Sequence, residues 1–251
     1  MLLDELDSVD WRSIPTPGLR MTRADRGRSE WRDPPSPRDG LLALAAAGSL
    51  PQVAAATSSL ANSAVLWGHM GAVFPAAVVA APFLLDIAER HGFAPARGAA
   101  LTLLGDMMES LPFAGFGRTT AVDGRPTPLC CAVAALVRQR REPVSELGGP
   151  GLSLIRNSDE HWRFEVREAV AAGNDTLDTL ALGLLCGRIP TPPPGGEIHR
   201  SGGTARLASV ALEYPADHET GEACLRLAGT SPSGPCAAGA VIHPARCGEV
   251  H

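Results

Sequence analysis

The sequence predicts an all-α fold of stacked antiparallel helix pairs, and three observations favour it. Aromatic residues make up only 4% of the 251 residues, fewer than a strand-rich sandwich or barrel normally holds. The segments 41–47 and 52–67 consist mainly of Ala, Leu and Ser, and Ala and Leu are strong helix formers. Finally, Phe74, Val78 and Ala81 are spaced by four and then three residues, which places them on one helical face.

We expect the helices to come in pairs, at 51–67 with 74–91, 94–110 with 128–141, and 159–172 with 175–186. Pro51 suits the first position of a helix, and Gly92 suits the position just after one. The first two pairs begin at residues 51 and 94, a step of 43 residues. Paired-helix solenoids repeat about every 40 to 47 residues, so this step predicts such a repeat.

The last pair depends on capping and on helical spacing. Ser158 is a favoured N-cap residue directly before the helix expected at 159–172. In that segment the apolar residues Trp162, Val166 and Ala169 recur at helical spacing. In the helix expected at 175–186, Leu180 and Leu184 do the same.

Composition divides the chain into four segments. We expect a Pro/Arg-rich, largely irregular leader at 1–40, because its prolines interrupt any helix longer than a turn or two. A helical domain at 41–190 follows. A linker with weak helices at 204–214 and 219–227 is expected over 191–228, and a Gly/Pro/Ser-rich, disordered tail over 229–251.

Particular stretches resemble a known group of proteins. The segment Leu66–Leu85, with Trp67-Gly68-His69-Met70-Gly71 at its start, is similar to the opening helix pair of HEAT-like proteins of actinobacterial type. The similarity continues through 94–97, 101–106 and 162–173, and covers about residues 50–190. The resemblance implies an α-solenoid whose common role is protein binding, and it supplies no catalytic residues.

Charge and motif content exclude several function classes. All 22 basic residues are Arg, so no lysine is present for a Schiff base or a phosphate-binding loop. The net charge of −5 argues against general attraction to nucleic acid or anionic membranes. Neither an H-E-x-x-H nor a G-x-S-x-G motif occurs. We therefore expect no cofactor and no metal.

The compartment predicted from the sequence is the cytoplasm. The acidic start Met1–Asp7 is unlike a secretory signal, which begins with basic residues and an apolar run. The longest apolar stretch, 73–85, is shorter than the about 20 residues that span a membrane. Without a secretory signal, the six cysteines are expected to be reduced.

Acidic residues and histidines supply the candidate reactive groups. On a helix, His161, Glu165 and Glu168 would share a face that either binds metal or transfers protons, or is simply solvated. Asp106 and Glu109 lie among Leu and Met, where a carboxyl group either gains a raised pKa or meets water at the helix edge.

Two further sets have alternative interpretations. Trp67 and His69 flank a glycine break between two helices, a common place for partner contact, although Trp67 also suits a core position. A zinc site is conceivable from four residues near the C-terminus, but they lack the usual close cysteine pair: Cys224, Cys236, His243 and Cys247.

The function predicted from the sequence is a non-enzymatic helical-repeat module that binds a partner protein in an assembly, regulatory or immunity role. Its expected contact surface consists of Trp67, His69, Asp106, Glu109, His161, Arg163, Glu165 and Arg167. One alternative is a small-molecule biosynthetic enzyme, or a subunit of one, that uses Asp, Glu and His in a helical pocket. A second is a HEAT-like DNA-repair glycosylase, which the net negative charge disfavours.

Overall fold

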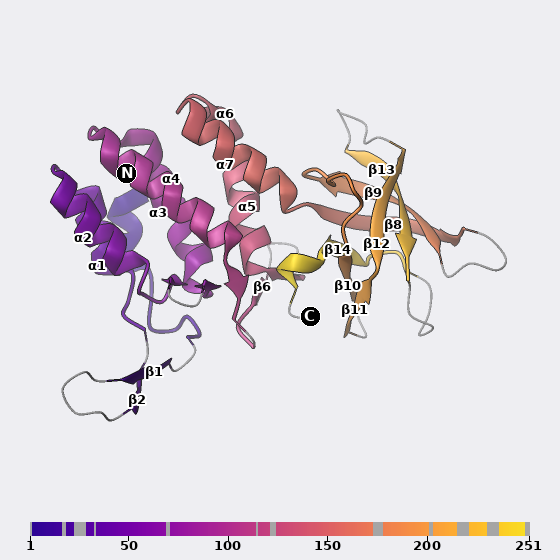
Figure 1. Cartoon of the computed structure of the whole chain (residues 1–251), viewed down its shortest axis with the longest axis horizontal. Coiled ribbons are helices and arrows are strands. Elements are labelled where there is room, and N and C mark those ends of the chain that lie inside the picture. The colour runs from indigo at the N-terminus through magenta and orange to yellow at the C-terminus, as the bar shows by residue number, and fades with distance from the viewer. Residues whose placement is uncertain are drawn as a thin grey trace. The chain divides into compact units, whose positions relative to one another are not determined.

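The computed structural model of the chain (Figure 1) describes residues 2–16, 19–22, 29–32, 34–68, 71–113, 115–120, 124–172, 178–200, 203–214, 221–229 and 236–248. The chain divides into two compact units, Met1–Ile155 and Arg156–His251. We call them unit 1 and unit 2 and describe each by itself.

Unit 1 is mainly helical. Its α-helices are α1 (Arg38–Ala45), α2 (Leu50–Leu60), α3 (Ala76–Arg90), α4 (Ala94–Glu109), α5 (Leu129–Gln139) and α6 (Arg141–Ser145). The helix α7 (Gly149–Glu160) contains the boundary between the units, after Ile155. A 3-10 helix, η1 (Leu2–Ser8), lies near the N-terminus.

Short strands accompany these helices. An antiparallel hairpin is formed by β1 (Leu19–Thr22) and β2 (Ser29–Arg32), and another by β6 (Arg118–Thr120) and β7 (Pro126–Pro128). A small sheet has the order β3 (Leu66–Trp67), β4 (Ala72–Val73) and β5 (Leu111–Pro112). In this sheet β5 runs parallel to β4, although the two are separated in sequence by α3 and α4.

The core of unit 1 surrounds α3, whose side chains Leu84, Leu85 and Ile87 are buried. This helix packs against α1, α4, α5, α6 and η1. It also continues through Pro82. The helices predicted at 74–91 and 94–110 are thereby confirmed, within two residues at each end.

The segment predicted as an irregular leader contributes to this core. Leu6 of η1 is fully buried, and the ring of Trp11 lies 6.3 Å from that of Phe83 on α3. The indole Nε1–H of Trp11 donates to the carbonyl of Leu6. The apolar residues near the N-terminus therefore pack against the helices of the same unit.

Unit 2 is built on a seven-stranded antiparallel sheet. Its strands are β8 (Arg163–Ala171), β9 (Thr179–Cys186), β10 (Gly196–Arg200), β11 (Gly203–Leu207), β12 (Ser209–Tyr214), β13 (Glu222–Ala228) and β14 (Val241–Pro244). They are ordered β11-β10-β14-β8-β9-β13-β12. A 3-10 helix, η2 (Ala245–Cys247), follows β14.

This sheet curls around its own core, as Figure 1 shows. The strands β11 and β12 are at opposite ends of the strand order, yet only Ala208 separates them in the chain. The inner face carries the apolar side chains of a second buried cluster, including Trp162, Phe164, Leu225 and Ile242. The opposite, outer face of the sheet is therefore the one left to carry polar and exposed side chains.

The all-α prediction and the resemblance to HEAT-like solenoids are wrong. Unit 2 is a β-sheet unit, so the chain is mixed α/β. In unit 1, α3 is a central helix that contacts many others, whereas helix pairs in a solenoid contact only their neighbours. The described residues form no helical-repeat solenoid.

Most of the incorrectly predicted helical residues fall in unit 2. In unit 1, the helix predicted at 51–67 ends at Leu60, and Leu66–Trp67 form β3. The segments 159–172 and 175–186 form mainly β8 and β9, and 204–214 and 219–227 form β11, β12 and β13. In β8 the side chains alternate, with Phe164 and Val166 buried and Arg163 and Glu165 partly exposed. This period of two also fits the sequence, and long-range pairing between strands decides in its favour.

The end of the chain that the sequence predicts as disordered contributes β14 and η2. The side chain of His243 on β14 is fully buried, and Ile242 belongs to the core of unit 2. Among the described residues, no helix has both the length and the apolar character required to span a membrane.

Candidate functional site

The outer face of the sheet in unit 2 carries a row of four side chains, one from each of four neighbouring strands. Glu168 of β8 is opposite Leu182 of β9, Leu182 is opposite Cys224 of β13, and Cys224 is opposite Tyr214 of β12. We call these four residues the cross-strand row. With strands spaced by about 4.8 Å, it spans about 14 Å of the sheet.

Two β-bulges place the ends of this row. On β8, the register shifts between Val166 and Glu168, so that Arg167 is the extra residue. On β12, it shifts between Leu212 and Tyr214, so that Glu213 is the extra residue. In a regular strand Glu168 would share the inner face with Val166, because side chains alternate. Each bulge instead turns the terminal residue of the row outward, a common function of bulges beside binding sites.

The cross-strand row lines a groove of about 400 Å³. The remaining residues that line it are Arg167, Gly183, Glu222 and Ala223. Leu182 and Tyr214 are 51% and 67% exposed, so apolar and aromatic surface of the groove is open to solvent. The groove therefore has an apolar floor, an aromatic wall on β12 and charged groups on β8 and β13.

Charges around the groove are largely paired within the protein. Arg167 forms an ion pair with Glu222. Beside the groove, both Arg226 Nε and Nη2 donate to the carboxylate of Glu213 at 3.0 Å, and this lowers the pKa of Glu213. Within the described part of the chain, Glu168 forms no ion pair. The groove thus keeps one acidic group available to a ligand.

The thiol in the groove is not activated. Burial, and secondarily the negative charge of Glu213, raises the pKa of Cys224, and Arg226 opposes the shift only in part. A raised pKa keeps the thiol protonated at neutral pH, and only the thiolate is a good nucleophile. Cys224 consequently serves as an apolar part of the groove floor.

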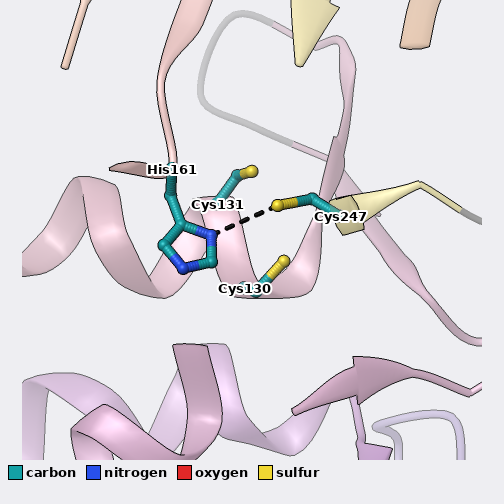
Figure 2. A group of neighbouring side chains, drawn as sticks. All are labelled: Cys130, Cys131, His161 and Cys247. Atoms are coloured by element: carbon teal, nitrogen blue, oxygen red, sulfur yellow. Dashed lines mark hydrogen bonds between the residues drawn. The ribbon is translucent and has the colours of Figure 1, made fainter. Parts of the chain in front are cut away.

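A different pair of reactive groups lies in the interior of the protein. Cys247 Sγ lies 3.3 Å from His161 Nδ1, and both residues are at most 2% exposed (Figure 2). His161 lies two residues before β8, and Cys247 ends η2. Figure 2 also draws Cys130 and Cys131, which come from the first turn of α5 in unit 1 and are buried.

Three further titratable groups are buried on the outer face of β10 and β14. His199 Nε2 lies 2.6 Å from Glu197 Oε1, and the rings of His199 and His243 are 5.2 Å apart in an edge-to-face arrangement. Glu197 is opposite His243 in the strand register. A Cβ on Gly248 would overlap the Glu197 carboxylate, so the Glu197 side chain would have to shift to admit a larger residue there.

The cysteines proposed from sequence for a zinc site do not form one group. Cys224 lines the groove, Cys236 belongs to the apolar core of unit 2, and Cys247 pairs with His161. Burial raises the pKa of the Cys236 thiol to about 11, which disfavours the thiolate that zinc requires. The spacing of these residues in sequence therefore does not correspond to proximity in space.

The other predicted contact residues are scattered. Asp106 and Glu109 are exposed on α4 of unit 1, where desolvation, and secondarily Glu109, raises the pKa of Asp106. Trp67 is half-buried against Ala72 and Phe74. His69 lies outside the described residues.

On β8 the predicted residues lie closer to the groove. Arg163 and Glu165 are 3.6 Å apart on the outer face, and of the predicted contact set only Arg167 lines the groove. Sequence reasoning missed Leu182, Tyr214 and Glu222. The alternation Leu180-x-Leu182-x-Leu184 was the available signal, because it has the period of a strand with an apolar outer face.

Comparisons with protein-family models, with curated proteins and with solved structures found no match to this chain.

Proposed function

We propose that this protein is a non-enzymatic binding protein that holds an extended segment of a partner protein in the groove of unit 2. The segment presents a basic side chain next to apolar ones. The observation that carries this proposal is the pair of bulges that turn Glu168 and Tyr214 to the same face. Together with the exposed Leu182, these residues gather apolar, aromatic and acidic groups on one face, as binding surfaces do.

The chemistry of the groove supports this choice of partner. Tyr214 and Leu182 offer exposed apolar area, and tyrosine is enriched among the residues that contribute most to protein interfaces. Glu168 offers a carboxylate that is not committed to an ion pair among the described residues. A Lys or Arg side chain can place its apolar stem on Leu182 and its charge beside Glu168 and the Tyr214 ring.

The enzymatic alternative has less support. Its predicted acid and base groups have different environments: Asp106 and Glu109 are exposed on α4, Glu165 is near Arg163 on the outer face of β8, and His161 is buried beside Cys247. In the groove itself, the Cys224 thiol has a raised pKa and is a poor nucleophile. Binding of nucleic acid is also disfavoured, since Arg163 and Arg167 are each close to a carboxylate.

We place this activity in the cytoplasm. All six cysteines, which lie in the described part of the chain, are free thiols, as expected of a protein from a reducing compartment.

Affinity capture with matched surface variants tests the proposed function. The full chain, its Leu182→Asp variant and its Leu152→Asp variant are used to capture proteins from cells that express it. Leu152 on α7 is 50% exposed and lies in unit 1, so it controls for the added charge. We expect a protein captured by the wild type and by Leu152→Asp to fall at least about tenfold with Leu182→Asp. Equal capture by all three proteins contradicts the proposal.

A further inference from the structure

The His161–Cys247 pair is independent of the groove and joins two distant parts of the chain. The two residues are 86 positions apart, yet Nδ1 and Sγ face one another at 3.3 Å in the buried interior (Figure 2). Imidazole nitrogen and thiolate sulfur are the donor atoms that Zn²⁺ prefers in proteins. The pair therefore combines suitable chemistry with exclusion from solvent.

We propose that His161 and Cys247 are ligands of a bound Zn²⁺ ion. Zinc–sulfur and zinc–nitrogen bonds of about 2.3 and 2.05 Å at a tetrahedral angle place the two donor atoms about 3.6 Å apart. The separation of 3.3 Å is close to this value, so an ion enters between Nδ1 and Sγ with only a small displacement of the side chains. The remaining positions of the tetrahedral ion are filled by further protein donors.

The backbone on both sides holds the two ligands in place. The N–H of His161 donates to the carbonyl of Ser158, and the N–H of Arg188 donates to the carbonyl of Asp159 in the same turn. On the other side, the N–H of Gly248 donates to the carbonyl of Ala245 and closes η2. Fixed backbone at each ligand lowers the entropic cost of ordering the site when the ion binds.

The bound ion would stabilise unit 2. It would link His161, two residues before β8, to Cys247 at the end of η2. These residues are 86 positions apart, so the link would constrain the chain between them in the unfolded state. Binding converts the Cys247 thiol to a thiolate and releases its proton to solvent, so the affinity for zinc decreases as the pH falls. Because neither ligand is exposed, the site is structural and not hydrolytic.

Metal titration of the full chain tests this proposal. The protein is stripped with a chelator, dialysed against Zn²⁺ alone and analysed for zinc by elemental analysis. We expect about one ion per wild-type chain and an affinity lower by at least about 100-fold in Cys247→Ser and in His161→Asn. The control is Cys186→Ser, which removes an exposed thiol of the same unit and should keep the full zinc content.

Spectroscopy of the metal-bound wild type identifies the ligands without any variant, so the result does not depend on whether a variant folds. Tetrahedral cobalt bound by a thiolate gives sulfur-to-metal charge-transfer absorption, and X-ray absorption at the zinc edge counts sulfur and nitrogen neighbours. At least one sulfur and one imidazole neighbour support the proposal. A wild type that binds no zinc, or that binds it without sulfur, overturns the proposal and leaves an ordinary thiol–imidazole hydrogen bond.

Discussion

Glu168 and Tyr214 occupy the two ends of one row across four strands of unit 2, and a β-bulge brings each of them to the outer face. Arg167 is the extra residue beside the first, and Glu213 is the extra residue beside the second. A regular strand at either place would turn its terminal side chain toward the inner face. The outward orientation of both ends of the row thus depends on the register of β8 and β12.

Deletion of Glu213 should remove the bulge on β12 and leave Tyr214 in the groove. The deletion joins Leu212 to Tyr214, and regular alternation then keeps Tyr214 opposite Cys224 on the outer face. We expect partner binding to stay close to that of the wild type in this variant and to fall in Tyr214→Ala, measured by calorimetry with the captured partner. The control is Glu213→Ala, which keeps the bulge and loses only an exposed ion pair with Arg226. A loss on deletion as large as that of Tyr214→Ala would show that the bulge itself, and not the outward Tyr214, is required.

Gly183→Ala should destabilise unit 2. A Cβ at this position would lie 2.0 Å from the carbonyl oxygen of Glu165 and 2.8 Å from the ring of Phe164, and backbone on a paired strand cannot move aside easily. We expect a loss of about 1–3 kcal/mol in the free energy of unfolding by denaturant titration. Gly98→Ala is the matched control, because no atom lies within 4 Å of the added carbon. In helix α4 that change should stabilise by about 0.5–1 kcal/mol, and equal effects at both sites would be inconsistent with this packing.

Asp106→Asn should stabilise unit 1 more at pH 7 than at pH 3. Desolvation, then Glu109, raises the folded-state pKa of Asp106 above 3.8. A raised pKa means that the stability contributed by the protonated form is complete below the unfolded-state pKa and is lost as the pH rises through the folded-state pKa. Asparagine does not ionise, so the variant avoids this loss. Denaturation midpoints at the two pH values measure it, and Glu109→Gln should reduce the difference in part.

Leu104→Ala and Arg163→Ala should have very different effects on folding. Leu104 is fully buried in the core of unit 1, so truncation leaves a cavity and costs about 2–5 kcal/mol. The Arg163 side chain is partly exposed and near Glu165, so its removal should change stability by less than about 1 kcal/mol. Thermal unfolding compares the two, and similar losses would mean that Arg163 is placed wrongly on β8.

The sequence was informative about helices and misleading about strands. In α3 and α4, apolar residues recur every three or four positions over 15 and 16 residues, which is long enough to identify a helix. The strands β8 and β9 have only 9 and 8 residues. Charged residues are interspersed among the apolar residues of β8, and β9 consists mainly of Leu and Ala. Such short segments fit a period of 3.6 and a period of 2 almost equally, and pairing with distant strands decides between them.

The candidate sites were even less accessible from sequence. The residues of the groove come from four strands, and the orientation of its two end residues depends on β-bulges. The local sequence pattern does not predict these bulges. Likewise, Cys247 appeared to belong with Cys236 and His243, which are near it in sequence, whereas its actual contact is His161. Arg167 is the one residue of the predicted contact surface that lines the groove. Glu168 and Cys224 also line it, although the sequence grouped them with other residues as candidates for metal binding or proton transfer.

Chemical footprinting of Tyr214 tests the central claim most directly. The chain contains one tyrosine, so nitration followed by mass spectrometry reports on the groove alone. Tyr214 is 67% exposed, and we expect it to react readily in the free protein. With saturating partner, as isolated by the matched capture experiment, the nitration rate should fall at least about tenfold, because the bound segment covers the ring. An unchanged rate in the saturated complex would contradict the proposal that the partner occupies this groove.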